Sequence, residues 1–513
     1  MGPPVSNPLF DALFQPWLAS DAPFLLLDDG AALSHRDFAD RAARFAAVLQ
    51  GAGVTAGDRV AVQVSKSPDA LAVYAACVRL GAAFLPLNTA YTANELGYFV
   101  GDATPRVLLV DPSRHDALAP LASEHAATLL TLGVAGDGSL AEAAADADAL
   151  DEVTPRAGDD LAAILYTSGT TGRSKGAMLT QANLLSNAET LREYWRFSKD
   201  DVLLHALPIF HTHGLFVATN ICLLAGSAMI FQGGFKAEQV MQRLPEATAL
   251  MGVPTFYTRL LDQPAFDKAA TAHMRLFVSG SAPLLAETHT LFESRTGHRI
   301  LERYGMTETN MNTSNPYDGE RRAGTVGFAL PGVEVRVCVP GTEDAVAPGE
   351  VGVLEVRGEN VFAGYWQMPE KTAEELRENG FFITGDLARI DSDGYVHIVG
   401  RGKDLIISGG YNIYPKEVEL LLDTQPGVLE SAVVAAPHPD FGEGVVAVLV
   451  ARPGETVDCE AIEHAIRDEI ARFKQPKHYA VFEELPRNTM GKVQKNLLRD
   501  QFAAVFTSPG EAG

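Results

Sequence analysis

The chain has 513 residues, of which 47% are hydrophobic and 21% are charged, and its formal net charge is −24. This length exceeds one ordinary domain, and this composition excludes a disordered polyelectrolyte. The excess of acidic residues excludes a general binder of nucleic acid or of anionic membranes, which requires a basic surface.

Helices and strands are predicted to alternate in the first part of the chain. The patterns predict helices over 37–51 and 67–80, the second with Ser67 as its N-cap. Strands are predicted over 59–64, 82–87 and 106–111. This alternation indicates βαβ units and parallel sheets. The segment 135–160 is rich in Ala, Asp and Gly, and we expect it to be a surface excursion.

The stretch 202–235 contains no Asp, Glu, Lys or Arg, which calls for a membrane test. A spanning helix needs about 20 mainly apolar residues, and Pro, His and Gly residues interrupt this stretch. We therefore expect a buried helix over 214–224 and a buried strand over 227–231, and no contact with a membrane.

The four cysteines are far apart and form no CxxC or zinc spacing. Such sparse use of cysteine is typical of a reducing compartment. The first ten residues, MGPPVSNPLF, lack the basic start and the apolar run of a signal peptide. We therefore expect a cytoplasmic protein.

The pattern changes in the last third of the chain. The segments 325–339, 352–357 and 395–399 are β-rich, whereas helices (415–422, 459–471) and strands (431–437, 444–451) follow Gly400. Two glycines within 400–404 indicate a hinge. The sequence thus predicts an α/β fold: a large N-terminal domain of βαβ-type sheets over 1–400, with a β-rich subdomain at about 320–400, and a small mobile α+β C-terminal domain over 401–513.

A segment rich in glycine and hydroxyl side chains follows the predicted strand 161–165 and reads YTSGTTGRSKG over 166–176. Glycines let backbone N–H groups turn toward an anion, hydroxyls donate hydrogen bonds, and Lys175 supplies charge. The pattern predicts a phosphate cradle, although it is not a Walker A loop. A flexible turn is the alternative, but such a turn seldom follows a buried strand and ends in Arg-Ser-Lys.

Five segments resemble, in the same order, the motifs of the acyl-adenylate-forming superfamily of acyl-CoA synthetases, firefly luciferase and peptide-synthetase adenylation domains. They are the 166–176 loop, YGMTE at 304–308, ITGD at 383–386, GRGKD at 400–404 with GGYNIYP at 409–415, and PRNTMGK at 486–492. The resemblance covers essentially the whole chain. It implies ATP and CoA as substrates and Mg²⁺ as a cofactor.

The resemblance also implies which residues bind ATP. In it, Thr307 contacts the α-phosphate, Asp386 accepts hydrogen bonds from the ribose hydroxyls, and Arg401 pairs with ribose or phosphate. Judged without the resemblance, Asp386 can equally form an Asx turn and Arg401 can be a plain exposed arginine. The implied set is Thr167, Ser168, Gly169, Thr170, Thr171, Gly172, Lys175, Ser281, Ala282, Pro283, Glu302, Arg303, Tyr304, Gly305, Met306, Thr307, Asp386, Arg401 and Lys492.

Lys492 is the implied catalytic lysine, together with Thr307 and Glu308. It would reach the substrate carboxylate and the α-phosphate, and its ammonium would offset negative charge during adenylation; a solvated basic loop is the alternative. Glu308 and Thr171 are the implied ligands of Mg²⁺, a hard cation that prefers oxygen ligands. Lys403 is the implied hinge residue. A surface glutamate and a solvated lysine are the alternatives at Glu308 and Lys403.

The implied CoA-binding residues are Gly409, Gly410, Tyr411, Arg472 and Lys474. Seven Lys or Arg and two Glu lie between 472 and 499, so this segment is locally basic within an acidic chain. We expect it to face the anionic ligands. Lys492 also resembles a lysine that acylation regulates in related synthetases, which implies a protein acetyltransferase and a deacetylase as partners.

The implied reaction needs no general base, because a carboxylate is already ionised at pH 7. It attacks the α-phosphorus of ATP to give acyl-AMP and pyrophosphate. The CoA thiol then attacks the acyl carbonyl and releases AMP. The small domain rotates between these two steps.

The segments expected to line the acyl pocket resemble malonyl-CoA synthetases within that superfamily. They read PIFHTHG at 208–214, GVPTFYTR at 252–259, SGSAP at 279–283 and MTETNM at 306–311. The resemblance implies His211, Arg259 and Ser281 as contacts of malonate, with Thr212 and Met311 shaping the space at its C2 atom. By helical periodicity alone Arg259 faces solvent, since Phe256 and Leu260 form the apolar face.

Other functions remain open at this point. The enzyme could activate methylmalonate or another small- or medium-chain carboxylate, or could load a carrier protein in place of CoA. A nucleotide-binding scaffold without catalysis is the alternative from another class, and the presence of Lys175, Glu308, Asp386 and Lys492 speaks against it.

Overall fold

The computed structural model describes residues 6–167, 174–408, 411–467, 469–488 and 491–506. The chain divides into two compact units. Unit 1 comprises Met1–Val335 and Val356–Phe382, and unit 2 comprises Arg336–Glu355 and Ile383–Gly513. Each unit is described by itself below. The domain division expected at 400/401 stays a prediction.

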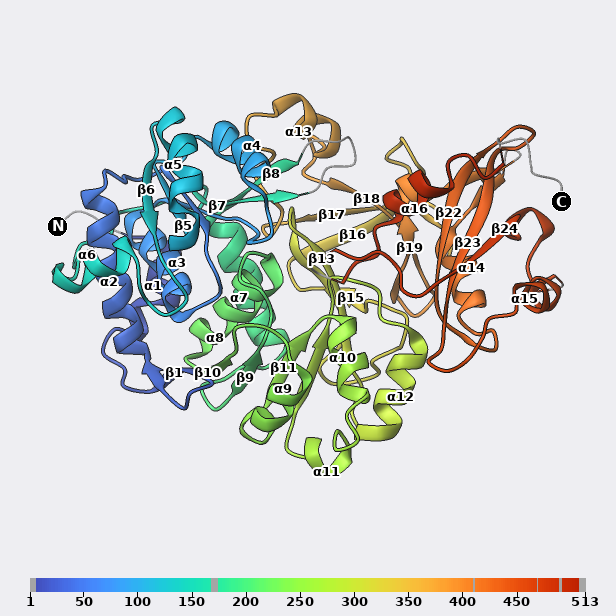
Figure 1. The fold of residues 1–513 in the computed structure, drawn as a ribbon, viewed down its shortest axis with the longest axis horizontal. Helices are drawn as coiled ribbons and strands as arrows, with labels where there is room; N and C mark the ends of the chain where they lie inside the picture. The colour runs from blue at the N-terminus through green and yellow to red at the C-terminus, as the bar shows by residue number, and fades with distance from the viewer. Residues whose placement is uncertain (1–5, 168–173, 409–410, 468, 489–490, 507–513) are drawn as a thin grey trace. The chain divides into compact units, whose positions relative to one another are not determined.

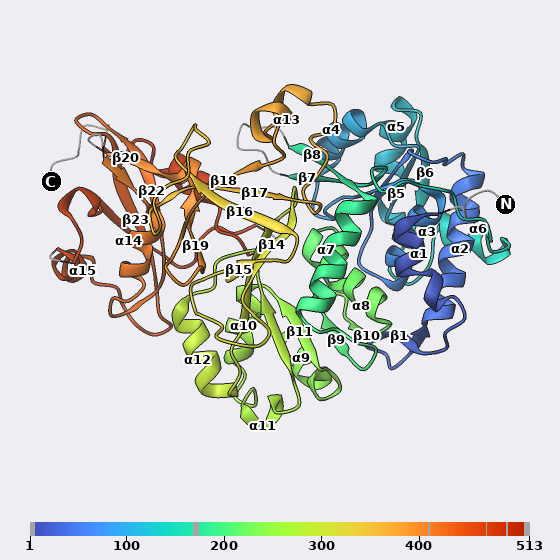
Figure 2. The ribbon, with the colours of Figure 1, turned by 180° about the vertical axis from the view of Figure 1, so that it is seen from behind.

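A nine-stranded sheet forms the larger part of unit 1 among the described residues. Its order is β15 (Phe328–Ala329), β14 (Asn310–Ser314), β13 (Leu301–Met306), β12 (Leu276–Ser279), β11 (Ala249–Gly252), β9 (Val202–His205), β10 (Ala228–Phe231), β1 (Pro23–Leu26) and β2 (Ala32–Ser34). The strands from β13 to β1 are parallel. Figure 1 shows β1, β10, β9 and β11 side by side, and Figure 2 shows β14 and β15 from behind. The carboxyl ends of the parallel strands therefore share one edge.

A second sheet in unit 1 carries the loop predicted to hold phosphate. Its described strands are β6 (Thr128–Thr131), β5 (Val107–Val110), β3 (Arg59–Gln63), β4 (Ala83–Pro86), β7 (Leu161–Thr167) and β8 (Lys175–Thr180), in this order. β7 and β8 are antiparallel and place Thr167 opposite Lys175. The two ends of the predicted phosphate loop are thus held together by a strand pair.

Helices pack around these sheets where the sequence supplies caps and an apolar face. Ser67 accepts a hydrogen bond from the N–H of Ala70 and caps α3, as predicted. The α-helices are α1 (Pro8–Leu13), α2 (His35–Gly51), α3 (Pro68–Leu80), α4 (Ala93–Ala103), α5 (His115–Glu124), α6 (Ser139–Asp146), α7 (Gln181–Tyr194), α8 (Asn220–Ala225), α9 (Ala237–Arg243), α10 (Pro254–Leu261), α11 (Lys268–Thr271), α12 (Ala286–Thr296) and α13 (Pro369–Glu375).

Two expectations about unit 1 can be judged here. The segment 135–160 contains α6, whose Leu140 and Ala144 are buried, while its other residues are exposed or partly exposed, so the segment lies at the surface as expected but includes a helix. The uncharged stretch 202–235 forms β9, a π-helix at His213–Thr219, α8 and β10. In the part of the chain that the structure describes, no helix has the length and apolarity needed to cross a bilayer.

Unit 2 contains a sheet with helices on both faces. Its described strands are β21 (Tyr411–Ile413), β20 (Ile406–Ser408), β23 (Gly442–Ala451) and β22 (Val428–His438), with β24 (His478–Phe482) beside β23. α14 (Pro415–Leu422) and α15 (Cys459–Ile466) share one apolar core with it, and α16 (Lys495–Phe502) shares the other. α15 ends five residues before the helix predicted over 459–471.

A four-stranded sheet has the order β16 (Val333–Cys338), β17 (Gly352–Gly358), β18 (Phe382–Ile390) and β19 (Val396–Arg401). In unit 2, β18 and β19 are antiparallel and place Asp386 opposite Arg401. A 3-10 turn at Gly402–Asp404 follows β19. The predicted α/β fold class is confirmed by these elements.

Candidate active site

The carboxyl ends of neighbouring parallel strands carry the residues predicted to contact the acyl substrate. β9 leads into the loop with His211 and Thr212, β11 into α10 with Arg259, and β12 into Ser281, while β13 contains Arg303. In open α/β sheets, ligands bind outside this edge. The sheet therefore brings distant segments of the sequence to one edge of unit 1.

Ser281 and His213 form the first contact at this edge. The Ser281 hydroxyl lies 3.3 Å from Nδ1 of His213. Burial lowers the pKa of His213, and the charge of Arg303 lowers it further, so the imidazole is neutral at pH 7. Ser281 has a φ of 71°, in the left-handed region that non-glycine residues seldom adopt. Such strain is concentrated at functional sites.

Two polar atoms on the neighbouring loop have no hydrogen-bond partner among the described residues. They are Nε2 of His211 and Oγ1 of Thr212. Buried polar atoms are normally hydrogen-bonded. Burial lowers the pKa of His211 to about 4, so this ring is also neutral at pH 7. His211 and Thr307 line one small cavity together with Tyr166. These atoms are therefore candidates for contacts with a polar ligand.

The two arginines at this edge differ in burial. Arg259 is exposed on α10, as helical periodicity predicts, but the buried residues beside Leu260 are Tyr257 and Leu261, and Phe256 is only partly buried. Arg303 is only 4% exposed. Its Nε and Nη2 atoms have no hydrogen-bond partner in the described part of the chain.

A compact ionic network surrounds the lysine of the predicted phosphate loop. Nζ of Lys175 lies 3.0 Å from each carboxylate oxygen of Glu375 and 4.0 Å from the ring centre of Tyr365. The Tyr365 hydroxyl donates to Glu375 at 2.6 Å and contacts Glu308 at 3.1 Å. Burial raises the pKa of Tyr365, and the charge of Glu308 raises it further, so its proton is retained. Lys371 also lies 3.0 Å from Glu375.

Glu375 and Tyr365 were not identified from the sequence. Burial raises the pKa of the Glu375 carboxyl, but the hydrogen bonds from Tyr365, Lys371 and Lys175 outweigh it and lower the pKa overall. Glu375 lies at the end of the short helix α13, outside every quoted motif. Its distance of 200 residues from Lys175 in the sequence left no local signal.

The carboxylate of Glu308 is suited to bind Mg²⁺. Glu308 is 5% exposed, and its carboxylate is a hard oxygen donor of the kind Mg²⁺ prefers. In the described ranges no group of three or more His, Cys, Asp or Glu could hold a metal alone. Mg²⁺ is usually bound through one or two carboxylates together with substrate phosphates, so one buried glutamate fits this mode.

The other residues of unit 1 that were predicted to contact ligands lie on β13, on the turn that follows it, on the loop after β12 and at the end of β7. The carboxylate of Glu302 accepts hydrogen bonds at 3.2 Å from His289 and from the N–H of Gly324. These contacts with the protein give Glu302 a structural role. Met311 is buried beside Gly305. Residues that are at least partly exposed are Thr167, Ala282, Pro283, Tyr304, Gly305, Met306 and Thr307.

Several predicted residues lie outside the described part of the chain. They are Ser168, Gly169, Thr170, Thr171 and Gly172 of the phosphate loop, and Gly409 and Gly410 of the CoA segment. Their roles stay predictions.

Unit 2 brings three predicted residues together. Nε of Arg401 lies 2.6 Å from Oδ1 of Asp386, which is 3% exposed. Lys492 is exposed, and Oδ1 of Asn488 accepts a hydrogen bond from its backbone N–H. Partial desolvation lowers the pKa of the Lys492 ammonium, the charge of Arg401 lowers it further, and Asp386 opposes them. Lys403 adds to this cluster of charge. The cluster is suited to an anionic ligand.

An aromatic contact in unit 2 links two parts of the predicted CoA-binding set. Tyr411, 58% exposed, stacks on Phe473 with ring centres 4.6 Å apart. This contact brings Tyr411 to Arg472 and Lys474. Arg472 is exposed, whereas Nζ of Lys474 lies 2.5 Å from Glu417.

The basic segment 472–499 is less positive than its sequence indicates. Lys474 pairs with Glu417, Arg487 with Glu430, Lys495 with Glu419 and Arg499 with Asp404. Within the described residues, Arg472, Lys477 and Lys492 form no ion pair. Of these three, Arg472 and Lys492 belong to the residues predicted to bind ligands, whereas Lys477 does not.

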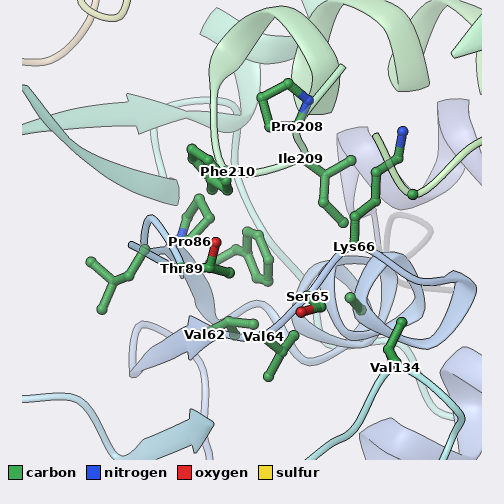
Figure 3. A pocket seen from close by; sticks show the side chains of 14 residues that line it. Val62, Val64, Ser65, Lys66, Pro86, Thr89, Val134, Pro208, Ile209 and Phe210 are labelled. Atoms are coloured by element: carbon green, nitrogen blue, oxygen red, sulfur yellow. The ribbon is translucent and has the colours of Figure 1, made fainter. Parts of the chain in front are cut away.

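A further cavity of about 250 Å³ lies in unit 1 beside the His211 loop (Figure 3). Its lining is mainly apolar and includes Val62, Val64, Pro208, Ile209 and Phe210. The stem of Lys66 also lines it, while its amino group contacts Nδ1 and the carbonyl of His205, both at 2.8 Å. Phe210 lines both this cavity and the small one at His211.

Comparisons with known proteins agree with this arrangement. The AMP-binding enzyme family matches residues 18–366, and the AMP-binding enzyme C-terminal domain matches residues 417–492. A feruloyl-CoA synthase from Amycolatopsis sp is 36% identical over 480 residues, covering 92% of this chain and 94% of that protein. A malonate–CoA ligase from Arabidopsis thaliana is 35% identical over 484 residues, covering 88% and 79%.

A solved structure extends the similarity to the fold. ATP-bound MatB from Rhodopseudomonas palustris superposes with a TM-score of 0.96 at 55% identity, covering 98% of this chain and 99% of that one. The similarity therefore extends over both units of the chain.

Proposed function

This chain belongs to the AMP-binding enzyme family, and we propose that it is an acid–thiol ligase that joins malonate to CoA at the expense of ATP. The reaction passes through malonyl-AMP and releases pyrophosphate and then AMP. Methylmalonate is an alternative substrate of the same site.

Malonate is favoured as the substrate by the polar groups on the acyl side of the site, which is the edge of the nine-stranded sheet with the residues predicted to contact the acyl substrate. The Ser281–His213 contact and the partnerless His211 and Thr212 atoms offer hydrogen bonds to a second carboxylate. An aromatic acid such as ferulate would leave these buried atoms unpaired, at a cost of about 1–3 kcal/mol each. The similarity to a malonate–CoA ligase supports the same choice.

The nucleotide is assigned to the phosphate-loop side of unit 1. Lys175 binds phosphate oxygens, Thr307 contacts the α-phosphate, and Glu308 would hold Mg²⁺. When bound, Mg²⁺ neutralises phosphate charge and orients the leaving pyrophosphate. In unit 2, we assign Asp386 and Arg401 to binding of the ribose, and Tyr411 and Arg472 to binding of CoA.

Adenylation then proceeds from the charges on the reactants. A malonate oxygen forms a bond to the α-phosphorus as the bond to the β-phosphate oxygen breaks. We assign Lys492 to this step, where its ammonium offsets the negative charge. The CoA sulfur next bonds to the acyl carbon, its proton passes to solvent, and AMP leaves. Lys403 is the proposed hinge for the change of domain arrangement between the two steps.

A panel of carboxylates tests the substrate assignment. Purified enzyme with ATP, Mg²⁺ and CoA is given malonate, methylmalonate, sulfoacetate, butyrate or ferulate, and AMP release is measured. We expect malonate to give the highest kcat/KM. Higher kcat/KM for butyrate or ferulate would contradict the proposal. Thioester formation only on an added carrier protein would favour the carrier-loading alternative, and absence of pyrophosphate exchange would favour a scaffold.

The role of Lys492 is tested by separating the half-reactions. Lys492→Ala should abolish malonyl-AMP formation yet still convert supplied malonyl-AMP into malonyl-CoA. Lys477→Ala, which removes another exposed cation of the same segment, is the matched control and should preserve both. Loss of both half-reactions in Lys492→Ala would contradict the assignment. We also propose Lys492 as an acetylation site, since its side chain is exposed; full adenylation by quantitatively acetylated enzyme would remove that proposal.

A further inference from the structure

Lys66 connects the two sheets of unit 1. It follows β3 of the second sheet and precedes Ser67, the N-cap of α3, whereas its amino group contacts His205 at the end of β9 in the nine-stranded sheet. The amino group points away from the cavity that its stem lines (Figure 3). This lysine has no role in the adenylation step assigned to the enzyme, so its place beside His205 calls for another explanation.

The three N–H groups of the Lys66 ammonium have three partners. Two are Nδ1 and the carbonyl oxygen of His205, each 2.8 Å from Nζ, and the third is the face of the Phe231 ring, whose centre is 4.3 Å away. Burial lowers the pKa of Lys66, and the charge of Asp28 opposes this effect. A neutral amine would still have N–H donors for His205. Lys66 is therefore an anchor for the His205 ring.

The tautomer of His205 is assigned from its contacts. Its Nε2 lies 2.8 Å from the carbonyl oxygen of Gly214, which can only accept, so Nε2 carries the proton. Nδ1 then accepts a hydrogen bond from Lys66. Burial lowers the pKa of His205, and the charge of Lys66 lowers it further, so the ring is neutral at pH 7. Lys66 thus keeps His205 as a donor toward Gly214.

The Gly214 carbonyl belongs to the first turn of the π-helix at His213–Thr219. It accepts hydrogen bonds from Nε2 of His205 and, at 3.0 Å, from the hydroxyl of Thr219. A Cβ atom at Gly214 would lie 2.1 Å from the carbonyl oxygen of Pro208, so the preceding loop packs directly on this glycine. π-helical turns are rare and are frequently found at functional sites. His205 therefore holds the start of the π-helix where the backbone is most closely packed.

His213 precedes Gly214, so this anchor lies one residue from the acyl side of the site. Nδ1 of His213 lies 3.3 Å from the Ser281 hydroxyl, and its Nε2 has no hydrogen-bond partner among the residues that the structure describes. A ring with so few contacts of its own is placed largely by its backbone. Because a shift of about 1 Å in a site can cost about 100-fold in rate, the position of Gly214 matters for catalysis.

We propose that Lys66 and His205 are positioning residues for the acyl side of the site. Lys66 fixes the tautomer of His205, and His205 holds the carbonyl of Gly214. This hydrogen-bonded series sets the start of the π-helix, and with it His213, before the acid binds. Both residues act through the backbone, and neither contacts the substrate. The inference rests on the proposed malonate ligase function, since malonate is the acid whose binding the series tunes.

Two substitutions of His205 separate the two nitrogens of its ring. In His205→Gln the amide NH₂ takes the place of Nε2, so the donor to Gly214 stays and the acceptor for Lys66 is lost. In His205→Asn the amide oxygen takes the place of Nδ1, so the acceptor stays and the donor is lost. We expect kcat/KM for malonate to fall by about tenfold in His205→Asn and by less than about threefold in His205→Gln.

Lys66→Met removes the amino group and keeps the stem that lines the cavity. The kcat/KM for malonate should fall by about tenfold through a higher KM for malonate, whereas the KM for ATP should stay unchanged. In the His205→Gln background the same change should cost less than about twofold, because an amide has no tautomer for Lys66 to fix. Lys199→Met, which removes an exposed lysine paired with Asp200, is the matched control and should behave as wild type.

NMR of enzyme labelled with ¹⁵N at histidine measures the tautomer directly, and the signals of His205 are identified by their loss in His205→Gln. In wild type, Nε2 should carry the proton. In Lys66→Met we expect a mixture of tautomers, because Nδ1–H can then donate to the carbonyl of the same residue. A merely structural role of Lys66 predicts instead the wild-type tautomer, an unchanged KM for malonate and a lower Tm, and this result would overturn the inference.

If Lys66→Met fails to fold, the two His205 variants decide the question. A wild type that prefers malonate, with equal losses in His205→Gln and His205→Asn, overturns this inference alone. Equal costs of Lys66→Met in the wild-type and His205→Gln backgrounds overturn it as well. A wild type that activates butyrate or ferulate in preference to malonate overturns the proposed function, and the same variants assayed with that acid still test the series.

Discussion

Lys175 and Arg303 are both buried cations of unit 1, 7% and 4% exposed, but among the described residues only Lys175 has a carboxylate partner. Glu375 contacts Lys175 with both oxygens, and Tyr365 covers the ammonium with its ring. Arg303 lies against Gly280, and two of its nitrogens have no hydrogen-bond partner within the ranges that the structure describes. One cation is compensated before any ligand arrives, and the other is not.

This difference suggests two ways to prepare a site for anions. A compensated cation contributes to stability, but phosphate must compete with Glu375 for it. An uncompensated cation destabilises the fold, and the substrate recovers that free energy on binding. Polyanionic ATP can displace a resident carboxylate, whereas a small dicarboxylate gains more from a cation that is already unpaired.

The largest effect is expected when Lys175 is removed. Lys175→Met leaves the carboxylate of Glu375 partly buried with Lys371 as its remaining cation. Breaking a buried pair costs about 3–5 kcal/mol, and because Lys371 remains we expect the free energy of unfolding to fall by about 2–3 kcal/mol. Urea unfolding measures this change, and calorimetry should show loss of ATP affinity.

The double variant Lys175→Met/Glu375→Gln is the control for this pair. It should recover most of the lost stability, because no carboxylate is left unpaired, but it should not recover ATP binding. A single variant as stable as wild type would show that the observed pair contributes nothing.

Arg303→Met should change stability in the opposite direction. Replacing an unpaired buried charge with an apolar side chain of similar length should raise the free energy of unfolding by about 1–2 kcal/mol. The same urea titration measures it. Malonate should raise the Tm of wild type and leave that of the variant unchanged. A destabilised Arg303→Met would mean that the guanidinium is already compensated, and the contrast with Lys175 would be lost.

Glu375→Gln tests the competition between the resident carboxylate and phosphate. Without the charge of Glu375, Lys175 is available to ATP, so we expect ATP to bind about tenfold more tightly, which corresponds to about 1.4 kcal/mol. Calorimetry with ATP and Mg²⁺ measures this. Glu374→Gln, which removes an exposed carboxylate on α13 that pairs with Lys371, should leave the affinity unchanged. Weaker binding to Glu375→Gln would instead make Glu375 a positioning residue for the nucleotide.

Much of the fold could be predicted because its signals are local. The apolar pattern of α14 gave its limits at Pro415 and Leu422, and Ser67 before Pro68 gave the start of α3. The segment around α6 lies at the surface as expected, but its helix was not predicted, because its Ala-rich composition resembles a loop in a chain with many alanines. Its burial depends on contact with α2, which no local pattern reveals.

The site could be predicted only in part for the same reason. Motifs identified Lys175 and Glu308, but the partner Glu375 comes from a remote helix and became visible only in three dimensions. The basic segment 472–499 was counted without Glu417, Glu419, Glu430 and Asp404, which lie outside it and neutralise four of its cations. The placement of Arg303, by contrast, was accessible from strand alternation.

The smallest effect concerns His211, the neutral group on the acyl side. Burial lowers its pKa to about 4, whereas an unfolded histidine titrates near 6.5. Between these values the unfolded chain binds the additional proton, so this group makes the protein less stable as the pH falls from 6.5 toward 4. At pH 5.5 the loss relative to pH 7.5 should be about 1.3 kcal/mol. His211→Asn should remove this share of the pH dependence, which urea unfolding at the two pH values measures. An identical pH dependence in wild type and variant would mean that His211 is protonated as readily in the folded protein as in the unfolded chain, and the acyl side would then gain a second positive charge in mild acid.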